Sequence, residues 1–347
     1  GNHQERVEVS PFCLVRVIAS INPFGFGWKL GKEESFRSPE TILSYSSAGL
    51  DKLSASLHCF AERYIVRSKY GQMDRPIAIN NWEATYFDFT EEKIMKLAST
   101  AASAGIELFV LDDGWYGRRT DDTRGLGDWT VNRSKLQDGL SGYADKIHSL
   151  GMKAGIWVEP EMVSMDSELY EKHPEWMIAI PGRRPSAGRH QYILDLSRAD
   201  VIEYLFQSMS SVFSSGIDYV KWDANRNMSD YFTSSPDARF QGELFHRYIQ
   251  GLYSLLDRLT SAFPDILFEF CSSGGNRFDL GALAFSPQGW VSDDTDAMER
   301  MRIQNGTLRG YPLSSMSNHV TASPNHQNLR KTGLEDRFGV ACFGVLG

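Results

Sequence analysis

The stretch that decides the fold is IDYVKWDANR, residues 217–226. Its first half is rich in β-branched and aromatic residues, a composition typical of a strand. Side chains alternate across a strand, so Val220 and Trp222 lie on one face. Lys221 and Asp223 share the opposite face. In a barrel of parallel strands, that second face points into the mouth at the carboxyl end, where barrel enzymes carry their chemistry.

The two charges on that face have two interpretations. A lysine two residues before an aspartate keeps the carboxylate ionised, because a nearby positive charge lowers the pKa of a carboxyl group. Nucleophilic catalysis needs an ionised and fixed carboxylate, so Asp223 is a candidate nucleophile. Lys221 and Asp223 can equally form a structural ion pair at a strand end, and this stretch alone does not separate the two interpretations.

Composition excludes two classes of partner. The chain has 347 residues, 41% of them hydrophobic, and a net charge of −8. This length suits one large barrel with additional structure, or two domains. The acidic balance argues against a nucleic-acid partner, since no basic cluster offsets it. No apolar run approaches the roughly 20 residues that span a bilayer, so we expect no membrane partner.

The cysteines and the chain ends bear on cellular context. Cys13, Cys59, Cys271 and Cys342 are scattered, without metal-ligand spacing. They predict reduced thiols in a cytoplasmic protein. The chain begins without Met or a signal peptide and ends in the apolar run 338–347. We therefore expect a fragment of a longer protein.

The first 75 residues differ in pattern from the rest and are predicted to be mainly β. Short apolar runs broken by Gly, Ser, Asn and Pro predict strands. These runs are residues 7–9, 12–18, 43–45 and 57–66. Residues 70–75 are predicted to be a linker. A Gly-rich loop with Phe24, Phe26 and Trp28 fits a hairpin with a buried aromatic better than a ligand site.

From Pro76 onward, strands alternate with amphipathic helices. A Gly ends three of the helices, as a left-handed cap does, and Thr90 and Ser197 are candidate N-caps. The predicted strands are residues 77–82, 107–111, 153–158, the opening stretch, 266–270 and, more weakly, 290–292 and 313–316. Four helices are predicted. The first begins after Thr90, the second contains Tyr143–Leu150, the third begins after Ser197 and the fourth contains Leu244–Leu259.

A recurring unit selects the architecture. SAGIELFVLDD (103–113), SLGMKAGIWVE (149–159) and SSGIDYVKWD (214–223) each place a Gly, an apolar strand and then carboxylates in order. Such alternation gives a parallel sheet. No Gly-rich phosphate fingerprint follows the first strand, which disfavours an open dinucleotide fold. We predict a (β/α)8 TIM barrel over residues 76–347, with its eighth strand near or beyond Gly347 and therefore C-terminally truncated.

The predicted strand ends gather carboxylates, tryptophans, amides and one lysine, with almost no histidine. This set disfavours a zinc site. Carboxylates alone can hold Mg²⁺, but Lys221 beside Asp223 competes with a cation. Paired carboxylates with Trp and Asn fit glycoside cleavage, in which one carboxylate attacks and another protonates the leaving oxygen.

Seven motifs on these strand ends resemble glycoside hydrolase family 36, the microbial α-galactosidases. They are NNWEA (80–84), DDGWYG (112–117), WVEPEMV (157–163), LDLSR (194–198), KWDANR (221–226), FCSSGGNRFD (270–279) and SDDTDAMERMRIQ (292–304). The resemblance runs in order from about residue 74. It also implies that residues 1–75 are the end of an N-terminal β-sandwich domain and a linker.

The resemblance implies a role for each matching residue. Asp223 is implied as the nucleophile and Asp293 as the general acid/base. A galactose subsite is implied for Trp82, Asp112, Asp113, Trp157, Arg189, Lys221, Asn225, Cys271 and Gly274. No metal and no cofactor is expected. Asp294 and Asp296 compete for the acid role on composition alone, Asp112 also fits a turn residue, and Cys271 also fits a buried apolar position.

The implied activity is a retaining α-galactosidase that removes terminal α-D-galactosyl residues from melibiose- or raffinose-type oligosaccharides. Retention implies carboxyl groups roughly 5–5.5 Å apart. The acid is expected to have a raised pKa, from burial and from the charge of Asp113 or Asp223. The family also implies a homotetramer at full length. The alternatives are a raffinose-synthase-like galactosyltransferase, an α-N-acetylgalactosaminidase, an inactive sugar-binding fragment and a metal-dependent barrel lyase.

Overall fold

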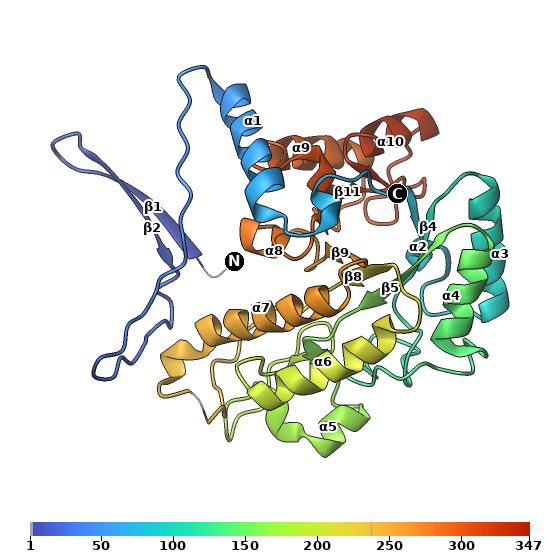
Figure 1. Ribbon diagram of the computed structural model, residues 1–347, viewed down its shortest axis with the longest axis horizontal. Coiled ribbons are helices and arrows are strands. Elements are labelled where there is room, and N and C mark those ends of the chain that lie inside the picture. Colours follow the sequence, from blue (N-terminus) through green and yellow to red (C-terminus); the bar gives the residue numbers. More distant parts are fainter. Residues whose placement is uncertain (1–2, 237) are drawn as a thin grey trace.

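The computed structural model describes residues 3–236 and 238–347, and its centre is an eight-stranded parallel sheet curled into a nearly closed barrel (Figure 1). The strands are hydrogen-bonded in chain order, with β3 and β12 at the two ends of the sheet. They are β3 (Ala78–Asn80), β4 (Leu108–Leu111), β5 (Lys153–Val158), β8 (Tyr219–Trp222), β9 (Leu267–Phe270), β10 (Gln288–Trp290), β11 (Met316–Asn318) and β12 (Val345–Leu346). The barrel prediction is confirmed.

The register of the central strands explains which side chains face the mouth. Lys221 on β8 pairs with Trp157 on β5 and with Glu269 on β9. All three side chains line the cavity described below. One residue earlier, Val220 is fully buried in the hydrophobic core. The alternation predicted from residues 217–226 is therefore confirmed.

Helices surround the strands, as Figure 1 shows for α3 and α4 beside β4 and for α6 and α7 beside β8. The main helices are α3 (Glu91–Ser103), α4 (Gly139–Ser149), α6 (Ala199–Phe213), α7 (Leu244–Ala262), α9 (Ala297–Thr307) and α10 (Leu334–Ala341). Shorter helices are α2 (Trp82–Thr85), α5 (Glu168–Lys172) and α8 (Leu280–Leu283). Single 3₁₀ turns cover Lys69–Gly71, Pro174–Trp176, Gln241–Glu243 and Leu313–Ser315.

Local capping chemistry fixes the ends of several helices. The Thr90 side chain accepts a hydrogen bond from the backbone N–H of Lys93, as its place before α3 predicts. Gly105 follows the end of α3 with φ +84°, a conformation that glycine adopts without strain. The prediction that Ser197 caps α6 is wrong. Its hydroxyl donates to Asp195, and the N-cap position is Arg198, one residue later.

The β-rich prediction for the N-terminal region holds only for its first part. Residues 7–9 lie in β1 (His3–Val9), which pairs antiparallel with β2 (Val15–Ile21). This hairpin projects from the barrel in Figure 1. Residues 43–45 form no strand, and residues 57–66 lie mostly in the helix α1 (Leu50–Phe60) and the π-helical turn Ala61–Ile65.

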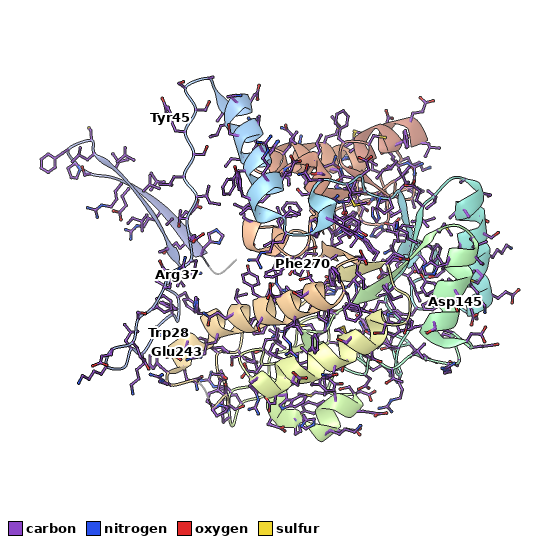
Figure 2. All side chains as sticks on the ribbon, viewed as in Figure 1. Trp28, Arg37, Tyr45, Asp145, Glu243 and Phe270 are labelled. Carbon is purple, nitrogen blue, oxygen red and sulfur yellow. The ribbon has the colours of Figure 1, made fainter. Side chains whose placement is uncertain are left out.

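The helix α1 lies against the barrel. Its Ser54 hydroxyl donates to the carbonyl of Arg309, 2.8 Å away, beyond the end of α9. A nitrogen of the His58 ring lies 2.7 Å from the carbonyl oxygen of Leu308. The segment before α1 packs elsewhere: Trp28 and Glu243 lie together at the start of α7 in Figure 2, where the Arg247 guanidinium covers the Trp28 ring.

Two of the last three strands differ in their bounds from the prediction, and the eighth lies where it was expected. Residues 290–292 were expected as a strand, but β10 ends at Trp290. Residues 313–315 form a 3₁₀ turn, so β11 begins only at Met316. The eighth strand, β12, lies close to Gly347 and pairs with β11 in parallel. No helix in the described ranges has the length and apolar character needed to cross a bilayer.

Candidate active site

A cavity of about 490 Å³ opens at the carboxyl ends of the barrel strands. It gathers residues from β3 to β11 and from the loops that follow these strands. Ten of the eleven site residues expected from the sequence line it: Trp82, Asp112, Asp113, Trp157, Arg189, Lys221, Asp223, Asn225, Cys271 and Asp293. The structure therefore brings these ten residues together around one cavity.

Gly274, the eleventh expected residue, does not line the cavity in the described part of the chain. Its φ is +81°, and a Cβ added there would lie 2.8 Å from both the Asp293 nitrogen and the Ser292 Cα. A side chain would therefore push the loop after β9 away from the backbone that carries Asp293. Gly274 permits a close approach of two loops.

Three donors orient the Asp223 carboxylate. Oδ2 accepts from the Trp157 indole at 3.1 Å and from the Asn225 amide at 2.7 Å. Oδ1 accepts from the backbone N–H of Ala224 at 2.8 Å. Asp223 is buried, so these bonds are shielded from competing water. The arrangement fixes the carboxyl group of Asp223 in one orientation at the end of β8.

The direct partner of Lys221 differs from the one that the sequence suggested. Its ammonium group lies 3.0 Å from Asp112 Oδ2, at the end of β4, and the expected contact with Asp223 is not the primary one. Burial lowers the pKa of Lys221, but the charges of Asp112 and Asp223 outweigh it and raise that pKa above its ordinary value. Lys221 is therefore a fixed cation between two strand-end aspartates.

Asp113 is held by a second cation that the sequence did not single out. The Arg119 guanidinium donates to both oxygens of Asp113, with a shortest distance of 2.7 Å, and the Tyr116 hydroxyl donates to Oδ1 at 3.1 Å. Burial opposes the charge on Arg119, but Tyr116 and Asp113 raise its pKa above the ordinary value. The pair is a buried bidentate salt bridge at the floor of the cavity.

This salt bridge gives a stability prediction. Replacing Arg119 by Met leaves the Asp113 carboxylate buried without its cation, so the free energy of unfolding should fall by about 3–5 kcal/mol. Denaturant unfolding followed by circular dichroism measures the change. Arg118→Met is the matched control, because Arg118 pairs with Asp166 on the exposed surface and should contribute less than about 1 kcal/mol. Equal losses in the two variants would contradict the prediction.

The structure separates Asp293 from its two neighbouring carboxylates. Asp293 lines the cavity, and its Oδ1 accepts from the Trp290 indole at 3.0 Å. Asp296 instead caps α9 by accepting from the backbone N–H groups of Met298 and Glu299. Asp294 accepts from the backbone N–H of Asp296 at 3.1 Å. Only the first of the three is placed to touch a ligand in the cavity.

The protonation of Asp293 is shifted in the direction an acid catalyst needs. Its side chain is open to the cavity, yet burial of the carboxyl group raises its pKa above the ordinary range. The negative charge of Asp223 raises that pKa further. The sequence suggested either Asp113 or Asp223 as the source of this charge, and the contributing group is Asp223. Trp290, Arg189 and Lys221 act in the opposite direction.

The loop residue Arg189 and the strand-end residue Cys271 both reach the site. The hairpin of β6 (Met162–Val163) and β7 (Tyr192–Ile193) carries the loop that contains Arg189. Its guanidinium donates to Asn225 Oδ1 at 2.7 Å, and its φ of +50° is unusual for a residue with a side chain. Burial, with the charge of Asp223, raises the pKa of Cys271 well above its ordinary value, so it is present as a thiol.

Glu159 supports the pocket through its contacts with two neighbouring segments. Its carboxylate accepts from the backbone N–H of Asn225 and from the Gln191 amide. Burial and the charge of Asp223 raise the pKa of Glu159 to about 8. Glu159 therefore links the backbone of Asn225 to the side chain of Gln191, with one hydrogen bond at each carboxyl oxygen.

Several residues of the cavity were not found from the sequence. They are Arg119, Gln191, Glu269, Trp290, Thr295, His319, His326 and Gln327. Burial and the nearby charges of Lys221 and Arg300 lower the pKa of His319 to about 3, so its ring is neutral. His319 directly follows β11, and correct bounds for that strand would have identified it.

A polar bridge joins the two sides of the cavity where the sheet ends. His326, on the loop after β11, lies 3.6 Å from the Glu83 carboxylate at the start of α2. The same carboxylate accepts from the backbone N–H of Ala322 at 3.3 Å. Over residues 3–236 and 238–347, no group of three or more His, Cys, Asp or Glu side chains is arranged to hold a metal ion.

A parallel barrel with a strand-end cavity of aspartates, tryptophans and one lysine is the arrangement of the (β/α)8-barrel glycoside hydrolases. The profile of the Melibiase family matches residues 35–347. The chain therefore belongs to the Melibiase family, glycoside hydrolase family 36.

Curated relatives and solved structures agree with this membership. The chain is 51% identical to alpha-galactosidase AgaA of Geobacillus stearothermophilus, over 100% of this chain and 48% of the relative. It is 47% identical to alpha-galactosidase Mel36A of Lactobacillus acidophilus, again over 100% of this chain and 48% of the relative. The crystal structure of AgaA superposes with a TM-score of 0.97 at 50% identity, covering 99% of this chain and 48% of that one. The chain thus spans about half the length of these relatives.

Proposed function

We propose that the protein is a retaining α-galactosidase that removes terminal α-D-galactosyl residues from oligosaccharides of the melibiose and raffinose type. The observation that carries the proposal is the joint position of Asp223 and Asp293 in one cavity, with the charge of Asp223 raising the pKa of Asp293. Solved complexes of AgaA variants with raffinose and with stachyose support this substrate class.

In the first step, an oxygen of Asp223 attacks the anomeric carbon of galactose while the bond to the leaving oxygen breaks. Asp293 gives its proton to that oxygen, so the departing sugar leaves as a neutral alcohol. Trp157, Asn225 and the Ala224 N–H hold Asp223 in place for the attack. The product of this step is a covalent galactosyl ester on Asp223.

In the second step, Asp293 removes a proton from water, and the water oxygen attacks the anomeric carbon. The ester bond breaks, Asp223 regains its charge and galactose leaves with its original configuration. Two inversions at one carbon give retention, which needs the carboxyl groups roughly 5–5.5 Å apart. Asp112 and Lys221 offer the sugar hydroxyls a carboxylate acceptor and an ammonium donor.

The test is hydrolysis of 4-nitrophenyl α-galactoside, with the anomer of the released galactose followed by proton NMR during the first minutes. Initial α-galactose supports the proposal, whereas initial β-galactose contradicts retention. Preference for the N-acetylgalactosamine substrate, galactosyl transfer to sucrose, or loss of activity with a chelator would instead favour the corresponding alternative. Galactose binding without turnover would identify a sugar-binding protein.

The raised pKa of Asp293 predicts the alkaline limit of activity. A catalytic acid works below its pKa, so activity is lost as pH rises through that pKa. Since burial and Asp223 raise it, the alkaline limb of kcat/KM should lie above the ordinary aspartate range of about 4. The measurement is kcat/KM for methyl α-galactoside between pH 4 and 9. A decline centred near pH 4 would contradict the assignment.

We also propose a cytoplasmic location and assembly into a homotetramer at full length. The four cysteines are free thiols, which supports the location. An exposed apolar stripe on the β1–β2 hairpin, with Val7, Val9, Val15 and Val17, supports burial in an assembly. Cell fractionation and light scattering of the full-length protein test the two proposals.

A further inference from the structure

The loop after β11 forms a series of hydrogen bonds to the short segment 293–296, which joins β10 to α9. The Gln327 amide nitrogen donates to the Asp293 carbonyl at 2.8 Å. The Gln327 amide oxygen accepts from the backbone N–H of Thr295 at 2.9 Å. One side chain therefore connects the backbone on either side of residue 294.

The orientation of this amide is determined by its partners. A backbone carbonyl only accepts and a backbone N–H only donates, so the Gln327 nitrogen must face Asp293 and its oxygen must face Thr295. A buried side chain supports the loop: Asn325 donates to the Thr295 hydroxyl at 2.9 Å and accepts from the Gln327 N–H at 2.9 Å. Thr321 donates to the Thr295 carbonyl at 3.0 Å.

These contacts fix the Asp293 backbone at its carbonyl, while the loop of Gly274 packs against its nitrogen. The Asp293 side chain has one further anchor, the Trp290 indole at 3.0 Å. With the backbone held by Gln327 and one carboxyl oxygen held by Trp290, few rotamers remain for the carboxyl group. A catalytic acid must lie within hydrogen-bond reach of the leaving oxygen, so small displacements reduce proton transfer.

We propose that Gln327 is a positioning residue for Asp293, which holds the acid at the leaving-group side of the bound sugar; this assignment rests on the proposed function. Gln327 lines the cavity, but both polar atoms of its amide are engaged by the segment 293–296. It acts through Asp293, and recognition of the galactosyl ring is left to the other residues that line the cavity.

The proposal predicts an effect that depends on the leaving group. Nitrophenolate departs without a proton, whereas an alkoxide needs one from Asp293. Gln327→Met keeps the length of the side chain and removes both hydrogen bonds. Its kcat/KM for methyl α-galactoside should fall by about tenfold more than its kcat/KM for 4-nitrophenyl α-galactoside. Its affinity for galactose should stay within about twofold of that of the unchanged protein.

The matched control is Ser323→Ala in the same loop. The Ser323 hydroxyl accepts from the Thr332 N–H and makes its bond within the loop region. This variant should keep the ratio of the two kcat/KM values, which separates loss of positioning from a general disturbance of the loop. A thermal melt of both variants shows that they are folded.

The outcomes test the role of Gln327 separately from the proposed function of the protein. A selective loss on the methyl substrate in Gln327→Met supports the positioning role. Equal losses on the two substrates, or weaker galactose binding, contradict that role and leave the proposed function intact. If the unchanged protein hydrolyses neither galactoside, the proposed function fails, and the role of Gln327 fails with it.

Discussion

Replacing Asp223 by alanine is expected to reduce kcat/KM for 4-nitrophenyl α-galactoside by at least about 10⁴-fold. The variant has no carboxylate at the end of β8 to form the covalent ester, and losses of this size follow removal of a nucleophile in other enzymes. Steady-state kinetics of the purified variant measures the effect. The three donors that surround Asp223 should remain in place, so galactose should still bind.

Asp145→Ala is the control for this experiment. Asp145 lies on α4, at the outer side of the molecule in Figure 2 and away from the strand ends. The control removes one aspartate and should leave the rate within about twofold. Near-normal turnover in Asp223→Ala would exclude this residue as nucleophile, whatever the control shows.

Replacing Asp293 by alanine is expected to have the second largest effect, and the loss of kcat/KM should depend on the leaving group of the substrate. Without the acid, kcat/KM for methyl α-galactoside should fall by about 10²- to 10⁴-fold, and the value for the nitrophenyl substrate should fall much less. Turnover of the nitrophenyl substrate should then be limited by breakdown of the ester. Added azide, which needs no general base, should restore kcat and give α-galactosyl azide.

Asp294→Asn is the matched comparison for Asp293→Ala. It keeps an acceptor for the Asp296 N–H while it removes the neighbouring carboxylate. The structure predicts near-normal kinetics for it, because Asp294 does not line the cavity in the described part of the chain. If azide rescue appeared in Asp294→Asn instead, the two roles would have to be exchanged.

The core of the fold could be predicted from sequence because its strands and helices follow simple periodicities. β4 and β5 are buried apolar runs that begin just after a helix-ending glycine. The helix α6 buries Val201, Leu205 and Met209 along one face. Alternation along β8 by itself predicts that Lys221 and Asp223 face the mouth of the barrel.

Elements without an apolar pattern were missed. The helix α9 buries Arg300 and Gln304 together with Ala297, so it has no apolar stripe to recognise. The helix α1 was interpreted as part of a β-rich segment, although Leu50, Leu53 and Leu57 already have helical spacing. Its partner surface near α9 lies about 250 residues away in the sequence, and no local rule reveals such a contact.

The site was predicted where it lies on strand ends and missed where loops bring it together. Asp112, Trp157 and Asp223 come directly from the strand pattern. Arg119 and Gln327 are placed by contacts between loops, and their roles depend on partners that only the folded chain provides. The partner of Lys221 was misjudged for the same reason, since Asp112 belongs to another strand.

The gap between the two end strands has a mechanical consequence. Seven strand pairs in the described ranges are joined by backbone hydrogen bonds, while β3 and β12 are the unjoined ends of the sheet. Trp82, which follows β3, and His319, which follows β11, line the cavity near this gap. The contact between Glu83 and His326 spans it. Because no strand pair in the described part of the chain closes the barrel at this point, the width of the cavity there depends on side-chain contacts at its rim, and a ligand that touches both sides would stiffen the barrel.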